Sequence, residues 1–154
     1  MRSVQVESFN GGREEWERLG YLNFLTSIFD APGIRMTMGS STRIREHISQ
    51  ALIIDGWATP FPIPGVSQLE ITAKKNSMGF QIQTGNVSRY AYDLLKLQTV
   101  FMSEQISCAC LAVPSASAAR EIGGNLANGS RIIEELRTFS KFINVPLLVL
   151  AFDS

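Results

Sequence analysis

The chain has few of the residues on which common catalytic and metal sites depend. Its 154 residues include two cysteines and one histidine. Two cysteines and one histidine are too few for a His/Cys zinc site. The residues around His47 carry no local signature of a Ser–His–Asp or Cys–His mechanism. Cys108 and Cys110 are too few for a disulfide framework, and their apolar surroundings indicate buried core residues on one face of a strand.

Long apolar runs and glycine-rich phosphate loops are also missing. No stretch reaches the roughly 18 apolar residues that a membrane-spanning helix needs, and residues 1–7 are too polar for a signal peptide. Neither GxxxxGK[ST] nor GxGxxG occurs in the sequence. We therefore expect a cytoplasmic protein without a membrane partner and without a nucleotide cofactor.

The chain has no net charge. Fourteen Lys and Arg residues balance fourteen Asp and Glu residues, which argues against binding of nucleic acid through bulk positive charge but allows a local basic cleft. An apolar fraction of 45% with 18% charged residues excludes a disordered chain. The length predicts a single domain over residues 1–154 that folds without a disulfide or a metal ion.

The pattern of apolar residues predicts an α/β fold. Two almost unbroken apolar runs are typical of strands that are buried on both faces. Helices are expected between them, which gives a sheet with helices on both faces. The expected elements are an opening strand near residues 4–9, helices at 13–29 and 43–55, strands at 66–73 and 78–83, a helix at 88–102, a buried strand at 106–113, a polar loop at 115–130, a helix at 131–142 and a buried strand at 145–152.

The most informative segment is the expected pair of strands between residues 69 and 83. Because side chains alternate along a strand, Gln81 and Gln83 share one face, and Glu70 and Thr72 share a face of the preceding strand. Nucleases of the PD-(D/E)XK type present an acid, and then an acid-x-Lys or acid-x-Gln pair, at such positions. These groups hold Mg²⁺ and orient a water molecule against the phosphate.

Several segments together resemble the type II restriction endonucleases of the BglII/BstYI group. Their order and spacing match those of the family. Residues 1–6 are similar to the family's N-terminus, 55–57 to the end of a helix, 80–86 to the active-site strand, 91–94 to the next helix and 143–149 to a Val-Pro-led last strand. The resemblance implies a restriction-endonuclease-like core with a central mixed sheet flanked by helices, Mg²⁺ as cofactor and double-stranded DNA as partner. It also implies a homodimer, because palindromic cleavage needs two active sites.

The departures from the family fall on its chemistry. Gln81 stands where the family has a metal-binding Glu, and Thr72 stands where it has an Asp, whereas Gln83 is retained. An amide offers one neutral carbonyl oxygen and does not neutralise a divalent ion, which is usually held by carboxylates. We therefore expect a restriction-endonuclease-like DNA-binding protein whose cleavage is lost or much reduced.

Two other functions remain open. In an active Mg²⁺-dependent endonuclease, Glu70 would take the vacant acid position and hold the metal with Gln81, while Gln83 and Glu46 would complete the catalytic group. The ordinary alternative for Glu46 and Glu70 is a solvated surface charge. A protein-interaction module on the same fold, without DNA contact, would suit the balanced charge and the apolar helix expected at 13–29.

Six further residues are candidates for DNA contact. The loop around residues 124–131 lies where the family has a polar loop that faces DNA, and a lysine pair near residue 75 is a second source of cations. An exposed loop without a binding role is the alternative for the first group, and solvated charges are the alternative for the second. The candidates are Lys74, Lys75, Asn125, Asn128, Ser130 and Arg131.

Overall fold

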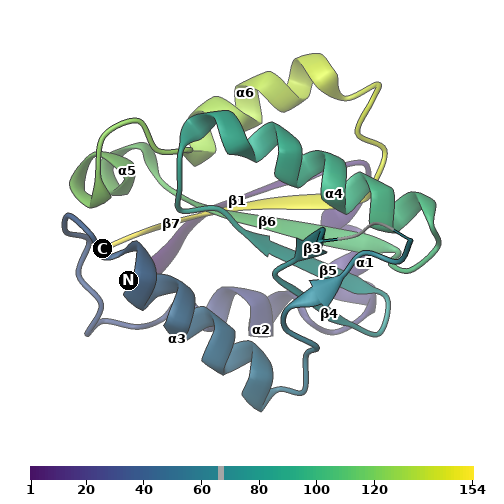
Figure 1. Ribbon diagram of the computed structural model, residues 1–154, viewed down its shortest axis with the longest axis horizontal. Coiled ribbons are helices and arrows are strands. Elements are labelled where there is room, and N and C mark those ends of the chain that lie inside the picture. The colour runs from purple at the N-terminus through teal and green to yellow at the C-terminus, as the bar shows by residue number, and fades with distance from the viewer. Residues whose placement is uncertain (66–67) are drawn as a thin grey trace.

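The two apolar runs of the sequence become neighbouring parallel strands at the centre of a five-stranded mixed sheet. The computed structural model describes residues 1–65 and 68–154 (Figure 1). The sheet has the order β1-β7-β6-β5-β4, in which β5, β6 and β7 are parallel and the two edge strands are antiparallel to their neighbours. The strands are β1 (Arg2–Phe9), β4 (Ala73–Lys75), β5 (Met78–Ile82), β6 (Cys108–Pro114) and β7 (Leu147–Asp153).

Helices cover both faces of this sheet, which confirms the predicted α/β fold. In Figure 1, α1 (Gly12–Arg18), α2 (Leu22–Ser27) and α3 (Ser41–Ile54) lie below the sheet, and α4 (Tyr90–Met102) and α6 (Gly129–Phe139) lie above it. Along β6, alternate residues enter two separate apolar clusters. Cys108 and Cys110 pack in the cluster of α1–α3, whereas Ala109 and Leu111 pack in the cluster of α4 and α6. A strand covered on both sides in this way carries an unbroken apolar run.

The single helix expected at residues 13–29 is wrong, because the chain forms two short helices there. Gly20 lies between α1 and α2 with φ +74°, in the left-handed region that glycine adopts without steric strain. The backbone N–H of Gly20 donates to Glu17 O and that of Tyr21 donates to Trp16 O, so the first helix closes with a turn. The apolar periodicity continues across this turn and conceals it.

The expected pairing of residues 66–73 with 78–83 is also partly wrong. β3 (Glu70–Ile71) pairs with β2 (Phe61–Pro62) in a separate two-stranded sheet, and β4 is the partner of β5. The turn expected at residues 74–77 is shorter, because Lys74 and Lys75 belong to β4 and Asn76 takes the left-handed conformation with φ +50°. Val66 and Ser67 of the expected first strand lie outside the described residues.

The loop expected at residues 115–130 contains a helix, α5 (Ala116–Ile122). The Ser115 hydroxyl accepts a hydrogen bond from the Ala118 N–H at 3.1 Å and so caps the first turn. The other expected helices form with shifted ends, and a short 3₁₀ turn, η1 (Val87–Arg89), precedes α4. Within the described part of the chain, no helix is long and apolar enough to cross a membrane.

The fold predicts a large effect of a single methyl group at Gly12. A Cβ atom on Gly12 would lie 2.4 Å from the carbonyl oxygen of Leu147, a backbone atom of β7. Gly12→Ala should therefore lower the free energy of unfolding by about 1–3 kcal/mol, although alanine has the higher helix propensity. The measurement is urea denaturation followed by circular dichroism.

Gly33→Ala is the matched control for this variant. A Cβ atom on Gly33 meets no atom within 4 Å, so its free energy of unfolding should stay within about 0.5 kcal/mol of the wild type. Equal stability of the two variants would contradict the close approach of α1 to β7.

Candidate functional site

A polar groove lies at the carboxyl end of β5, between that strand, α3, η1 and α4. The groove has a volume of about 410 Å³. Its charged and amide side chains come from segments far apart in the sequence. We call this pocket the β5–α4 groove. These side chains are Arg45, Gln68, Glu70, Gln81, Gln83, Arg89, Asp93 and Lys96.

Asp93 of α4 is the centre of the groove. The residue is 4% exposed, so its carboxylate has lost almost all contact with bulk water. Its Oδ1 atom accepts a hydrogen bond from Gln81 Nε2 at 2.9 Å and lies 2.8 Å from Lys96 Nζ. Its Oδ2 atom accepts a hydrogen bond from Gln83 Nε2. A buried carboxylate needs such compensation, because desolvation penalises an isolated charge by several kcal/mol.

The orientation of the two glutamine side chains is fixed by hydrogen bonds on their other side. Gln81 Oε1 accepts from the backbone N–H of Thr72 at 2.9 Å and from its hydroxyl at 3.3 Å. Gln83 Oε1 accepts from the backbone N–H of Gly85 at 2.7 Å. Both amide groups therefore turn their NH₂ groups toward Asp93 and their carbonyl oxygens toward backbone donors.

Three of the four predicted catalytic residues meet in the groove. Glu70, Gln81 and Gln83 line it, and the backbone oxygen of Glu70 accepts a hydrogen bond from Lys96 Nζ at 3.0 Å. Glu46 is not brought to this site. It is exposed on α3 and lines a separate depression together with Arg45, Ser49 and Gln50.

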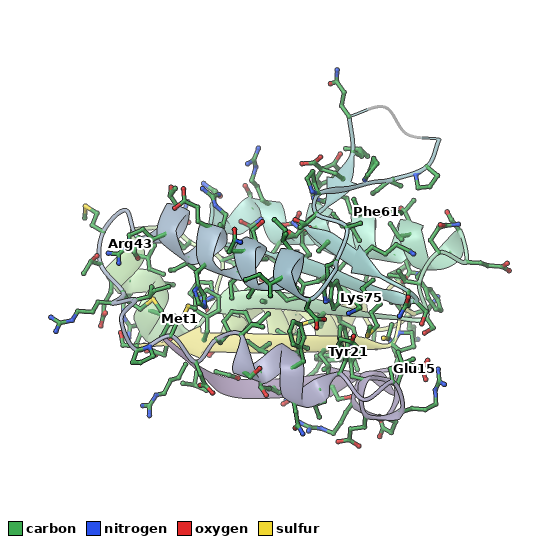
Figure 2. The ribbon with its side chains drawn as sticks, turned by 90° about the horizontal axis from the view of Figure 1, so that it is seen from below. Met1, Glu15, Tyr21, Arg43, Phe61 and Lys75 are labelled. Atoms are coloured by element: carbon green, nitrogen blue, oxygen red, sulfur yellow. The ribbon has the colours of Figure 1, made fainter. Side chains whose placement is uncertain are left out.

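The predicted lysine pair does not line the groove. Lys75 Nζ lies 2.9 Å from Asp55 Oδ2 and 4.9 Å from the centre of the Tyr21 ring. Figure 2 shows Lys75, at the end of β4, next to Tyr21, which directly precedes α2. Lys74 Nζ donates to the backbone oxygen of Asn76 at 2.6 Å and lies 5.3 Å from the centre of the Phe61 ring.

The predicted polar loop forms a second pocket next to the groove. Asn125, Asn128 and Arg131 line this pocket of about 370 Å³ together with Arg120, whereas Ser130 is exposed at the start of α6 and is not part of the lining. The loop is held against the chain segment that follows Gln83. The backbone N–H of residue 87 donates to the backbone oxygen of residue 125 at 3.0 Å. The backbone N–H of residue 127 donates to the backbone oxygen of residue 85 at 3.1 Å.

Sequence reasoning missed four charged residues of the groove: Arg45, Arg89, Asp93 and Lys96. A signal for two of them was present. Asp93 and Lys96 are three residues apart on an otherwise uncharged helix, a spacing that places both side chains on one face. The sequence contains no comparable signal for Arg45 and Arg89, because they join the groove only through tertiary packing.

The two cysteines are core residues, as the sequence predicted. Both are free thiols without solvent exposure. Burial raises the pKa of Cys108 to about 12 and raises the pKa of Cys110 well above its ordinary value. The thiolate is the form that reacts and binds metals, and burial favours the thiol form of both side chains.

Comparison with known proteins identifies the family. The family model of restriction endonuclease BglII/BglIII matches residues 8–152. The chain belongs to this family. Its fold is similar to the crystal structure of restriction endonuclease BglII complexed with a DNA 16-mer, with a TM-score of 0.84 and 11% identity over 100% of this chain and 79% of that chain. The crystal structure of free BglII gives a TM-score of 0.73 and 11% identity, and the match covers 100% of this chain and 80% of that chain. No curated protein matches the sequence.

The BglII-like family generally uses Mg²⁺, but the groove does not fit this ion. Hard divalent cations bind oxygen atoms, mostly of carboxylates. The groove instead directs two NH₂ groups and an ammonium group at its one buried carboxylate, and both glutamine oxygens already accept hydrogen bonds from backbone donors. Within residues 1–65 and 68–154, no group of three or more His, Cys, Asp or Glu residues could hold a metal ion.

The hydrogen bonds around Asp93 predict that its carboxylate stabilises the fold. Asp93→Asn removes the charge opposite Lys96 and places an NH₂ group against a glutamine NH₂ group. The free energy of unfolding should fall by about 3 kcal/mol, since one half of a buried ion pair is left uncompensated. Chemical denaturation measures the change.

Glu7→Gln is the control for Asp93→Asn. Glu7 forms an exposed ion pair with Arg137, whose guanidinium lies 3.5 Å from the carboxylate. Loss of an exposed pair should change the stability by less than about 1 kcal/mol. If the two variants lose the same small amount, the carboxylate of Asp93 does not have the structural role described above.

Proposed function

We propose that the protein binds double-stranded DNA and that its cleavage of DNA is lost or much reduced. The observation that carries this proposal is the closed hydrogen-bond network around Asp93. By the resemblance, the positions at which the family has its acids hold Thr72 and Gln81. The Gln81 amide accepts a hydrogen bond from the Thr72 hydroxyl and donates one to Asp93. The resemblance thus assigns this groove to the family's active-site position, and the polar groups of the groove bind one another.

The charge of the groove supports binding of a polyanion. Among its side chains, three cations (Arg45, Arg89 and Lys96) face two carboxylates (Glu70 and Asp93), which leaves a positive balance. The neighbouring pocket adds two arginines, Arg120 and Arg131, of which Arg131 pairs with Glu135 at 2.6 Å, and no carboxylate lines the pocket itself. Lysine and arginine side chains bind DNA mainly through phosphates, with release of counterions. The neutral chain therefore has a locally basic edge where β5 and β6 end.

The relatives of the fold support the same partner. BglII, which has the same fold, has been crystallised in a complex with a DNA 16-mer. In this protein, the side chains of the second pocket, with Ser130 beside it, are placed to contact phosphates or base edges next to the groove. These side chains are Asn125, Asn128 and Arg131. Cytoplasmic localisation stays a prediction from the sequence.

The first test is DNA binding by a variant without the two groove arginines. We expect the wild type to retard duplex DNA with a randomised centre, in a salt-dependent manner, in a gel-shift titration. Arg45→Ala/Arg89→Ala should weaken this binding at least about tenfold, because each removes a charged phosphate contact. The slope of log affinity against log salt concentration should fall by about two.

Lys141→Ala is the control, because Lys141 is an exposed cation just after α6, near the start of the chain segment that leads into β7. Its loss should leave the affinity within about twofold. Wild-type protein that does not bind DNA would overturn the proposal and favour a protein-interaction module. Nicking of plasmid DNA with Mg²⁺ that disappears in Glu70→Ala would show an active nuclease that uses Glu70.

A homodimer is the second part of the proposal. The outward face of α4 carries Tyr92, Leu95 and Met102, which are 51%, 56% and 68% exposed. Ala91 and Thr99 complete this face, so it is uncharged along the helix. A continuous uncharged helix face suits self-association around a two-fold axis. Because Tyr92 also lines the β5–α4 groove, pairing here would bring two grooves close together, as recognition of palindromic DNA requires.

Leu95→Glu should therefore dissociate the dimer. Two like charges would face each other across the two-fold axis, and we expect the weight-average mass in sedimentation equilibrium to fall toward 17.0 kDa. Ile54→Glu is the control, since Ile54 is a 77% exposed apolar residue on α3. A monomeric wild type, or a Leu95→Glu variant as dimeric as the control, would contradict pairing through α4.

A further inference from the structure

Because the groove does not fit a divalent cation, the positive charge opposite a bound phosphate has to come from the chain itself. A phosphate held in this groove needs a positive charge close to it, and the family generally provides Mg²⁺. The groove offers an internal cation at its centre. Lys96 Nζ lies 2.8 Å from Asp93 Oδ1 and 3.0 Å from the carbonyl oxygen of Glu70, and the Lys96 side chain is 13% exposed.

The surroundings of this ammonium group are those of a bound cation. It is held by a carboxylate oxygen from α4 and by a backbone carbonyl oxygen from β3, and its third contact is the Tyr92 ring, whose centre is 5.8 Å away. Oxygen atoms and an aromatic face are the groups that stabilise a desolvated cation. The Asp93 carboxylate is in turn oriented by the amides of Gln81 and Gln83.

We propose that the Lys96 ammonium replaces the divalent cation in this site, so that the groove binds a DNA phosphate without metal. This inference rests on the proposed function, DNA binding. Lys96 acts as a fixed monovalent cation, and Arg45 and Arg89 supply the remaining positive charge of the groove. Asp93 positions the ammonium and does not contact the phosphate.

A cation that is part of the chain has two consequences for binding by the groove. Wild-type affinity for DNA is independent of divalent cations, because the cation is part of the chain. Removal of the ammonium leaves the Asp93 carboxylate without its counter-charge, in a groove that Glu70 also lines. Such a site attracts a divalent cation, and the glutamine side chains can then turn their carbonyl oxygens toward it.

The first experiment compares DNA binding by the wild type in EDTA and in Mg²⁺. The probe is the duplex with a randomised centre, at constant ionic strength, and we expect the two affinities to agree within about twofold. A wild type that binds DNA only with Mg²⁺ would overturn the replacement of the metal. A wild type that does not bind DNA in either buffer would instead overturn the proposed function.

The second experiment removes the ammonium with Lys96→Met. In EDTA, this variant should bind DNA about tenfold more weakly than the wild type, and Mn²⁺ should restore most of the loss. Electron paramagnetic resonance should detect Mn²⁺ binding by Lys96→Met in the absence of DNA, but not by Lys96→Met/Asp93→Asn. Lys96→Arg, which keeps the charge, should bind DNA in EDTA.

Lys141→Met is the control. Lys141 is an exposed lysine just after α6 that does not line the groove. Loss of its ammonium should neither weaken DNA binding in EDTA beyond about twofold nor create Mn²⁺ binding. Equal DNA binding by Lys96→Met and Lys141→Met in EDTA would overturn the role of Lys96.

Discussion

The structure of the site depends on one buried carboxylate. Asp93 is 4% exposed, and its compensation comes from both sides of the groove: two amide groups from the β5 segment and an ammonium group from its own helix. Because an uncompensated buried charge is strongly destabilising, these partners stabilise the wild-type groove in this arrangement. The same hydrogen bonds that connect α4 to the central sheet also occupy the polar groups from which a metal site would be built.

The position of the groove follows from the topology of the sheet. The side chains that follow β5 and β6 meet at the carboxyl edge of parallel strands, where open α/β sheets place their ligand sites. Arg45 reaches this edge from α3, and the hydroxyl of Ser41 at the start of that helix donates to the backbone oxygen of Thr84 at 3.1 Å. A chain with zero net charge can therefore present a basic groove, because distribution rather than total charge determines the local potential.

The sequence predicts most of the fold and only part of the site. The apolar runs of β6 and β7 and the glutamine pair of β5 are local patterns, and local patterns can be interpreted without a structure. The break at Gly20 could not be predicted in this way, because the apolar period continues through it. Asp93 was missed for a different reason: the resemblance directed attention to the strand, whereas the carboxylate of this groove stands on the following helix.

The difference between an acid on the strand and an acid on the helix changes what the groove can bind. A carboxylate at residue 81 would leave its oxygens beside Thr72 and Asp93, and two adjacent carboxylates favour a divalent cation between them. With an amide at residue 81, the Lys96 ammonium compensates the Asp93 carboxylate without an ion from solution, and Arg45 and Arg89 keep the charge of the groove positive. The number of buried carboxylates relative to lysines thus determines which cation the groove holds. The fold itself does not fix this number.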